Sequence, residues 1–317
     1  MIKILANDGI HADGKLLLED AGYELHTEKI PQDELPSKLN EYDVIIVRSA
    51  TKVRKDLIDQ APNLKIIARA GVGLDNIDVE YAQEKGIKVI NTPAASSLSV
   101  AELVFAHIFS IARFLNNSHR EMPVKGNTDF KKLKKAYSGG FELKGKTLGI
   151  VGLGRIGREA ARIGLAMGMK VLAADPMVDE VDIEVKLFDT YGVTASAKID
   201  TVSMKDLLKG SDIITLHVPG GQGALIGKEE LDQMKDGIVL VNAARGGVID
   251  ETVLLEGLES GKILAAGLDV FEGEPTPKQE LLEHPRISVS PHIGASTNEA
   301  QANIGRELAD KIIEFFQ

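Results

Sequence analysis

Short apolar runs rich in β-branched residues alternate with amphipathic stretches along the whole chain. Such a run, bounded by polar residues, indicates a buried strand, and apolar residues at helical spacing between the runs indicate helices. The runs predict strands at 2–5, 44–47, 64–68, 88–90, 147–151, 171–174, 213–216, 238–241, 264–268 and 287–289. Strands that alternate with helices form parallel sheets covered on both faces. We therefore predict an α/β fold of doubly wound parallel sheets.

A glycine-rich segment directly follows the fifth predicted strand and opens a helical stretch. It runs from Gly152 to Gly157 as Gly-Leu-Gly-Arg-Ile-Gly, and the next predicted strand ends at Asp175. A strand, a G-x-G-x-x-G turn, a helix and an acid after the next strand form the fingerprint of a dinucleotide site. Gly152 permits the tight turn, Gly154 lets the backbone approach a pyrophosphate, and Gly157 lets helix and strand pack closely.

The fingerprint predicts NAD as the cofactor. Backbone groups of Arg155 and Ile156 would hold the pyrophosphate, because a helix N-terminus favours an anion. Asp175 would accept hydrogen bonds from the adenosine ribose and would repel the 2′-phosphate of NADP. The alternative, a glycine-rich turn in another α/β protein, is disfavoured by the strand, helix and acid around the glycines.

The late position of the fingerprint predicts two domains. A separate α/β pattern precedes it, and a long helical stretch at 99–116 lies between the two. The polar segments 91–97 and 290–297 are expected to cross between the domains, and the helix predicted at 298–316 to return to the first. The active site is then expected in the cleft between domains. The expected bounds are 1–97 and 292–317 for a flavodoxin-like substrate domain, and 98–291 for an inserted Rossmann NAD-binding domain.

Composition restricts the possible partners. The 317 residues are 44% hydrophobic and 26% charged with a net charge of −10. This balance indicates a soluble globular protein and argues against a general nucleic-acid or anionic-membrane surface. The absence of cysteine excludes disulfides and a catalytic thiol, and the scattered histidines predict no metal site. With no apolar run long enough for a membrane span and no signal-peptide pattern, we expect a cytoplasmic protein that acts on a small molecule.

Three ionisable residues lie shortly after predicted strands in the second half of the chain. These are Arg245, Glu274 and His292. Ligands of open parallel sheets bind beyond the carboxyl ends of the strands, and an arginine there can offer a bidentate contact to a carboxylate. Taken singly, each has a plainer explanation as a surface ion pair, a loop acid or a core histidine.

Their order and the motifs around them resemble the NAD-dependent D-2-hydroxyacid dehydrogenase family. The resemblance covers nearly the whole chain and is greatest to the phosphoglycerate dehydrogenases of that family. It implies oxidation of D-3-phosphoglycerate to 3-phosphohydroxypyruvate, the first step of serine biosynthesis. The motifs that carry it lie at 47–53, 69–76, 91–93, 145–149, 152–157, 244–247, 268–271 and 291–297.

The resemblance assigns catalytic roles to the three ionisable residues. His292 would take the hydroxyl proton of a 2-hydroxy acid, Glu274 would hold the imidazole, and Arg245 would bind the substrate carboxylate. An unperturbed imidazole titrates near neutral pH, which suits transfer in both directions. Further cofactor contacts implied by the resemblance are Val218, Ala243, Ala244, Asp269 and Gly294.

Cations early in the chain are expected to bind the substrate. Arg48 and Arg69 follow predicted strands, Lys52 lies four residues after Arg48, and the resemblance places this segment in the substrate loop. The lysines at 131, 132, 134 and 135 would add a cation to a partner subunit's cleft or, as the plainer explanation, form a solvated flank. The substrate-binding residues are thus expected to be Arg48, Lys52, Arg69, Gly71, Val72 and Gly73.

Other members of the family give the first alternative function, with glyoxylate, hydroxypyruvate or lactate as substrate. An NAD-sensing corepressor on the same fold is the second, although the chain shows no tail or basic arm. Two features depart from the family. The segment 176–202 is longer than expected and would flank the adenine. The chain also ends after its last helix, without the regulatory domain of long phosphoglycerate dehydrogenases, so we expect no inhibition by serine.

The resemblance also implies a homodimer. The helix predicted at 99–116 would be central to it, because its apolar residues exceed what one side of a helix uses. Alternatively, both sides of this helix pack within one chain. The apolar face consists of Leu103, Phe105, His107, Ile108, Ile111 and Phe114.

Overall fold

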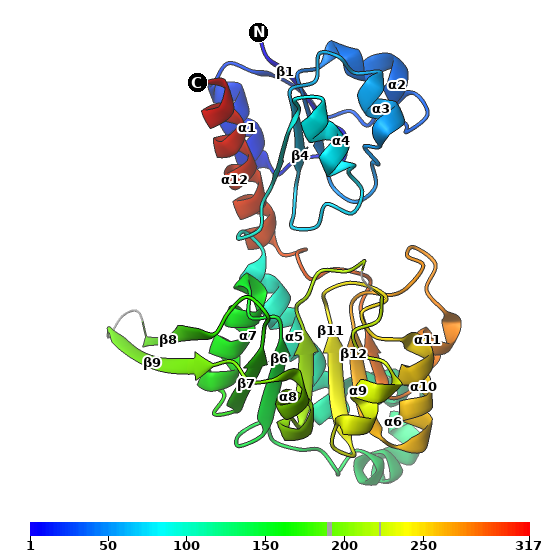
Figure 1. Ribbon diagram of the computed structural model, residues 1–317. Coiled ribbons are helices and arrows are strands. Elements are labelled where there is room, and N and C mark those ends of the chain that lie inside the picture. The colour runs from blue at the N-terminus through cyan, green and yellow to red at the C-terminus, as the bar shows by residue number, and fades with distance from the viewer. Residues whose placement is uncertain (189–191, 222) are drawn as a thin grey trace. The chain divides into compact units, whose positions relative to one another are not determined.

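The computed structural model describes residues 1–188, 192–221 and 223–317. The chain divides into two compact units (Figure 1). Unit 1 comprises Met1–Ser99 and Ala295–Gln317, and unit 2 comprises Val100–Gly294. Both boundaries lie a few residues after those expected at 97 and 291.

Unit 1 contains a five-stranded parallel sheet. Its order is β2-β1-β3-β4-β5, the flavodoxin-type order, which confirms the expected fold of the first domain. Continuous apolar runs do not detect β2, since it is a short edge strand with polar ends. The strands are β1 (Lys3–Ala6), β2 (Glu24–His26), β3 (Val44–Val47), β4 (Ile66–Arg69) and β5 (Lys88–Asn91).

Helices cover both faces of this sheet. On one face, α12 packs its apolar side, including Ile304, Leu308 and Ile312, against the strands. Figure 1 shows α1 beside α12, and a Cβ on Gly14 of α1 would lie 2.4 Å from the Gly305 carbonyl oxygen. The other face carries the short helices. The helices are α1 (Ala12–Asp20), α2 (Leu35–Lys38), η1 (Leu39–Glu41), α3 (Lys55–Asp59), α4 (Val79–Glu84) and α12 (Asn298–Phe316).

Unit 2 contains a six-stranded parallel sheet in the order β13-β12-β11-β10-β6-β7. Its buried residues form one cluster on each face, as a doubly wound sheet requires. The strands are β6 (Thr147–Val151), β7 (Lys170–Ala174), β10 (Ile213–Leu216), β11 (Ile238–Asn242), β12 (Ile263–Leu268) and β13 (Ile287–Val289). The helices are α5 (Ser97–Ala112), α6 (Leu115–Ala136), α7 (Arg155–Ala166), α8 (Met204–Gly210), α9 (Lys228–Gln233), α10 (Glu251–Ser260) and α11 (Gln279–Glu283).

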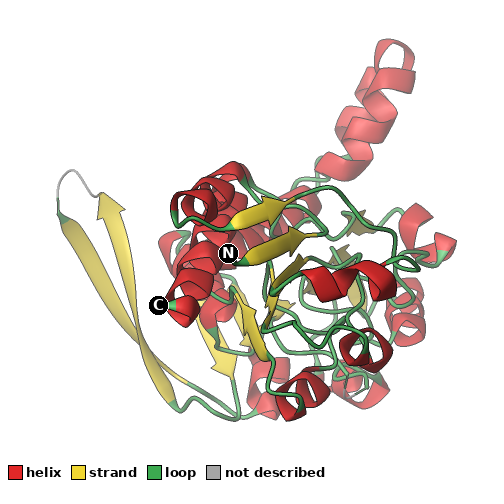
Figure 2. Ribbon diagram, turned by 90° about the horizontal axis from the view of Figure 1, so that it is seen from above, coloured by secondary structure: helices red, strands yellow, loops and turns green. Residues whose placement is uncertain are grey.

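A β-hairpin is inserted beside β7 where a further parallel strand would complete the nucleotide-binding half. At the position of that strand, the structure has an isolated parallel bridge between Ala173 and Thr201. The antiparallel pair β8 (Glu180–Phe188) and β9 (Val193–Asp200) precedes the bridge and extends away from the sheet (Figure 2). This hairpin accounts for the unusual length of 176–202, of which residues 189–191 lie outside the described residues. Its apolar residues Ile183 and Ile199 pack in the cluster that α7 covers.

The single helix expected at 99–116 is two helices. The first, α5, ends at Ala112, and Phe114 adopts a left-handed backbone with φ of 53° before α6 begins. Phe105, His107, Ile108 and Ile111 are buried within the chain. These four residues therefore pack inside unit 2, and exposed apolar residues appear mainly on α6.

No single helix of residues 1–188, 192–221 and 223–317 is long and apolar enough to cross a membrane. Together, α5 and α6 pass that test of length and composition, but they are bent by 57°.

Candidate active site

The glycine fingerprint forms the turn between β6 and α7. Gly152 has φ of 93°, and a Cβ there would lie 2.4 Å from the carbonyl oxygen of His217. A Cβ on Gly157 would lie 2.1 Å from the Gly152 carbonyl oxygen. The first and third glycines are thus required by contacts within the fold, as the sequence predicts for the turn and for close helix packing.

Gly154 differs from its neighbours because a Cβ there would meet open space. It is the N-cap of α7, and no side chain caps this helix end. The first backbone N–H groups of α7 therefore have no side-chain cap, and an uncapped helix N-terminus suits an anion. These features fit a dinucleotide pyrophosphate.

Asp175 lies directly after β7 and closes the same turn. Its Oδ2 accepts a hydrogen bond of 2.7 Å from the Leu153 N–H, and its Oδ1 accepts one of 2.8 Å from the Met177 N–H. Because a carboxylate has about four acceptor positions, these two bonds leave capacity for a ribose hydroxyl. Asp175 therefore shapes the glycine turn while remaining suited to the expected ribose contact.

His292 and Glu274 form a hydrogen-bonded pair, although 18 residues separate them in the chain. The imidazole Nδ1 lies 2.8 Å from Glu274 Oε2, and the side chains of His292 and Glu274 are 47% and 34% exposed. The other carboxylate oxygen, Oε1, accepts a bond of 3.0 Å from the Phe271 N–H. Since an ionised carboxylate only accepts, Nδ1 carries a hydrogen, and in the neutral ring this tautomer leaves the lone pair on Nε2.

Arg245 lies in the loop that follows β11. The buried Asn242 shapes this loop, because its amide accepts from the Ala244 N–H at 3.0 Å and donates to the Arg245 carbonyl at 2.8 Å. A Cβ on Gly246 would lie 2.0 Å from the carbonyl oxygen of Phe271. The Arg245 loop therefore packs directly against the loop that carries Glu274.

Asp269 follows β12 and is 1% exposed. Its carboxylate accepts hydrogen bonds from the N–H groups of Ile293 and Gly294 and from the hydroxyl of Ser290. The resemblance assigns Asp269 to the cofactor, but in the structure its carboxylate is engaged with the loop that carries His292. This contact brings two of the expected cofactor residues, Asp269 and Gly294, together.

The remaining expected cofactor residues follow neighbouring strands of the sheet. Val218 lies beyond the end of β10, and Ala243 and Ala244 lie beyond the end of β11. A Cβ on Gly152 would lie 3.2 Å from Val218, so Val218 borders the glycine turn. Burial lowers the pKa of the adjacent His217 to about 4, so this imidazole is neutral at pH 7.

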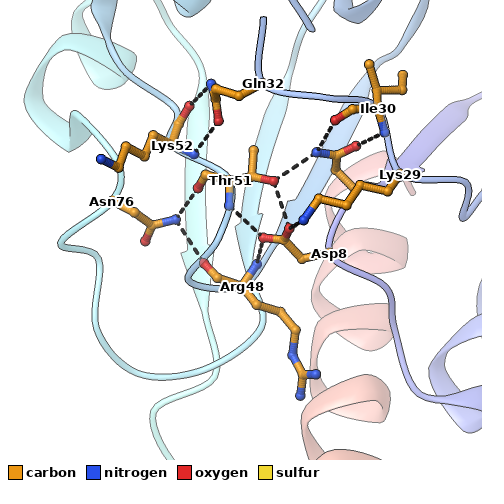
Figure 3. A network of polar contacts seen from close by, with 9 residues as sticks. Asp8, Lys29, Ile30, Gln32, Arg48, Thr51, Lys52 and Asn76 are labelled. Carbon is orange, nitrogen blue, oxygen red and sulfur yellow. Dashed lines mark hydrogen bonds and ion pairs between the residues drawn. The ribbon is translucent and has the colours of Figure 1, made fainter. Parts of the chain in front are cut away.

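In unit 1, a short loop follows β3 and contains Arg48 and Lys52 (Figure 3). Asp8 accepts hydrogen bonds from the Arg48 N–H at 2.8 Å, the Thr51 N–H at 3.0 Å and the Thr51 hydroxyl at 2.8 Å. On the other side, Asn76 Nδ2 donates to the carbonyls of Arg48 and Thr51. The backbone of the loop is therefore held from two sides.

The two arginines expected to bind substrate come from neighbouring strands. Arg48 directly follows β3, and Arg69 is the last residue of β4, paired in register with Val47. A Cβ on Gly71 would lie 1.5 Å from Arg69 Nη1, so the arginine folds over this glycine, whose φ is 142°. Val72 and Gly73 follow, both half-buried. Arg69 Nη1 also donates to the Ala70 carbonyl at 2.9 Å.

Residues 105–294 match the family model described as the NAD binding domain of D-isomer specific 2-hydroxyacid dehydrogenases. The chain is 45% identical to hydroxypyruvate reductase of Thermotoga maritima, over 98% of this chain and 97% of that relative. It is 43% identical to D-3-phosphoglycerate dehydrogenase of Methanocaldococcus jannaschii over 98% of its length, but it spans only 57% of that relative.

The D-lactate dehydrogenase of Aquifex aeolicus, solved in complex with NAD and lactic acid, matches 99% of this chain and 95% of its own. Its TM-score is 0.76 and its sequence identity is 30%. The chain belongs to the D-isomer specific 2-hydroxyacid dehydrogenase family. Unit 2 is its NAD-binding domain, which agrees with the open helix N-terminus at Gly154.

Several residues that shape the candidate site lie outside the sequence motifs. Asp8, Asn242 and Ser290 hold the loops described above through hydrogen bonds, as does Asn76, which lies in a motif but has no role assigned from the sequence. Their only signal is their position, because Asp8 and Ser290 lie just beyond strand ends and Asn242 is the last residue of β11. Within the described ranges, no group of His, Asp or Glu side chains is arranged to hold a metal ion.

Proposed function

We propose that this protein oxidises D-3-phosphoglycerate to 3-phosphohydroxypyruvate with NAD. The hydrogen bond between His292 and Glu274 carries the proposal for the chemistry, because it leaves Nε2 as a proton acceptor. The choice of a phosphorylated substrate is supported by Arg48 on its preformed loop. The 43% identity of the chain to the D-3-phosphoglycerate dehydrogenase of Methanocaldococcus jannaschii agrees with it.

In the proposed reaction, His292 Nε2 takes the proton of the substrate hydroxyl. The C2–H bond breaks and C2–O becomes a carbonyl. NAD, when bound, supplies the acceptor for the hydride that leaves C2. Glu274 stabilises the imidazolium and fixes its tautomer. Arg245 binds the substrate carboxylate and polarises the oxygen on C2. In the reverse direction the same imidazolium returns the proton.

The proposed phosphate contact involves Arg48. Its guanidinium forms no ion pair or side-chain hydrogen bond that the described residues supply, and Figure 3 shows it extending away from the network that holds its backbone. Lys52 is exposed on the same loop, where Gln32 bonds its backbone N–H and carbonyl at 2.9 Å each. A fixed loop with a free arginine suits bidentate recognition of a phosphate.

A second candidate function is the reduction of hydroxypyruvate. The observation that favours it is the 45% identity to the hydroxypyruvate reductase of Thermotoga maritima, a relative of nearly the same length. This substrate has the carboxylate and the C2 oxygen that Arg245 and His292 require, but it has no phosphate. It therefore makes no use of Arg48.

Steady-state kinetics on a substrate panel distinguish the two candidates. Oxidation is followed as NADH formation at alkaline pH with 3-phosphoglycerate, glycerate and lactate, with the oxo-acid product trapped. Reduction is followed with hydroxypyruvate, 3-phosphohydroxypyruvate and glyoxylate. We expect the highest kcat/KM for the phosphorylated pair. If hydroxypyruvate equals or exceeds 3-phosphohydroxypyruvate, the second candidate replaces the first.

We also propose that the protein is a homodimer. The α5 residues expected to form its interface are largely buried in the chain, so the support comes from α6. This helix exposes large apolar side chains that nothing in the described part of the chain covers. They are Leu115, Met122, Val124 and Phe130. Sedimentation equilibrium tests this assignment: a monomer at micromolar concentration would contradict it, and Phe130→Glu should weaken the dimer.

A further inference from the structure

The backbone of His292 is in the left-handed region, with φ of 53°. Residues with a Cβ rarely adopt this conformation, and they do so only where the surroundings hold them in it. His292 is also the residue to which we assign the proton transfer. Whatever stabilises this backbone therefore determines where the imidazole lies.

Asp269 holds three consecutive backbone N–H groups of this loop. Its carbonyl oxygen accepts from the His292 N–H at 2.8 Å, its Oδ1 from the Ile293 N–H at 2.8 Å, and its Oδ2 from the Gly294 N–H at 2.9 Å. A Cβ on Gly294 would lie 3.2 Å from Oδ2, so the glycine permits the approach. The orientation of the Asp269 carboxylate thus defines the turn.

A chain of hydrogen bonds from the core orients this carboxylate. The Ser290 hydroxyl lies 2.6 Å from Asp269 Oδ1, and His107 Nε2 lies 2.9 Å from the same hydroxyl. His107 Nδ1 lies 2.9 Å from the hydroxyl of Ser288. These contacts join α5 to β13 and to the loop of His292. Both partners lie about 180 residues after His107 in the chain.

The direction of each bond in this chain follows from its acceptor. An ionised carboxylate only accepts, so the Ser290 hydroxyl donates to Asp269 and must itself accept from His107 Nε2–H. The neutral ring then accepts at Nδ1 from Ser288. Burial lowers the pKa of His107, opposed by the negative charge of Asp269, so the ring is neutral at pH 7.

We propose that His107 and Ser290 are positioning residues for the reaction, acting through Asp269 to hold the strained backbone of His292. The proposal rests on the catalytic role proposed for His292. It differs from a packing role. His107 is 4% exposed, and an apolar side chain of similar size would fill its place but would leave the Ser288 and Ser290 hydroxyls without their His107 partner.

The two serines provide a matched pair of variants. Both bond to His107 at 2.9 Å, but only Ser290 bonds to Asp269. Ser290→Ala should lower kcat about tenfold or more, since small displacements of a reacting group lower rates strongly. Ser288→Ala should keep kcat within about threefold of the parent.

Conservative variants separate positioning from packing. Ser290→Thr retains the hydroxyl and should recover most of the kcat lost in Ser290→Ala. His107→Gln retains one donor and one acceptor, whereas His107→Leu retains only bulk, so His107→Gln should have the higher kcat at unchanged KM. Equal kcat losses in Ser288→Ala and Ser290→Ala would overturn the proposal, because His107 would then act only in the core.

We call the three hydrogen bonds that Asp269 accepts from the His292, Ile293 and Gly294 N–H groups the clamp. Amide hydrogen exchange tests it without measuring turnover. In the full chain, the Ile293 and Gly294 amides should exchange at least about tenfold faster in Ser290→Ala than in Ser288→Ala, because the carboxylate that holds them is no longer oriented. Equal protection in both variants overturns the proposal. If exchange changes as expected while the parent protein oxidises no 2-hydroxy acid, the clamp stands and the proposed reaction fails instead.

Discussion

Two loops of this protein, one in each unit, are held in the same way. In unit 1, Asp8 follows β1 and accepts N–H groups of the loop after the neighbouring β3. In unit 2, Asp269 follows β12 and accepts N–H groups of the loop after the neighbouring β13. In both units, a carboxylate that follows one strand shapes the loop that follows the neighbouring strand of the sheet.

The two loops differ in what they present. The Asp8 loop carries Arg48, whose long side chain reaches its position through several rotatable bonds. The Asp269 loop carries His292, whose backbone is left-handed and whose ring is bonded to Glu274. A flexible arginine tolerates small backbone shifts, but a proton-transferring imidazole must stay within hydrogen-bond reach. Under the proposed function, the same device serves substrate binding in unit 1 and proton transfer in unit 2.

The largest expected loss of activity comes from the loop that carries His292. His292→Ala should lower kcat about 10²- to 10⁴-fold with every substrate, because the general base is lost. The Kd for NADH, measured by fluorescence titration, should change little. The exposed His119 on α6 serves as the control, and His119→Ala should leave kcat unchanged. Retained turnover in His292→Ala would remove the distinction between the two loops.

A large effect of pH on stability is expected in unit 2. Burial lowers the pKa of His217 from 6.5 to about 4. Between these values the unfolded chain binds a proton that the folded chain excludes, so stability is complete above pH 6.5 and falls towards pH 4, by about 3 kcal/mol in total. Urea unfolding from pH 7.5 to pH 4 measures this loss. The variant His217→Asn should flatten that part of the profile, and an unchanged slope would contradict the assignment.

The next effect distinguishes binding from chemistry. Arg48→Ala should raise the KM for 3-phosphoglycerate about 10- to 100-fold, the value of a charge-assisted hydrogen bond, and leave kcat nearly unchanged. For glycerate and hydroxypyruvate, KM should change little. The control is Arg306→Ala, which removes a cation of unit 1 that pairs with Asp13. A similar rise for all substrates would mean that Arg48 does not bind a phosphate.

The smallest expected effect on KM tests the hydrogen bonds by which Asp8 holds the loop after β3. Asp8→Asn keeps the shape of the side chain but weakens its acceptors, and it should raise the KM for 3-phosphoglycerate about fivefold. Because it acts through Arg48, it should add little in the Arg48→Ala background. The exposed Asp20→Asn is the control. A loss of kcat equal to that of Ser290→Ala would show that the two clamps do not differ in role.

The sequence predicts the two parallel sheets well, because ten of their strands lie in apolar runs. It does not predict β8, in which Val181, Ile183 and Val185 alternate with acidic residues rather than forming a continuous run. It also predicts one helix where α5 and α6 meet at a left-handed Phe114. A left-handed backbone at a residue with a Cβ cannot be predicted from the neighbouring sequence, since the surrounding packing imposes it.

For the site, the motifs predict the residues but not what holds them. Glu274 and His292 are identified by family motifs, and the structure joins them at 2.8 Å. The glycines of the turn lie within one short stretch of chain, so a sequence motif identifies them. By contrast, His107 has the helical position of one more residue on an apolar face, and Asp8 is simply an acid after a strand. Their partners lie 183 and 43 residues away.

The sequence by itself determined the strands, the glycine turn and the order of the reacting groups, because each depends on residues close together in the chain. Only the tertiary structure decided that β1 lies beside β3 and β12 beside β13, and this order places one carboxylate under each loop. Hydrogen bonds need atoms within about 3 Å, and distant segments approach that closely only after the sheets have formed. The clamps on Arg48 and His292 are therefore properties of the fold.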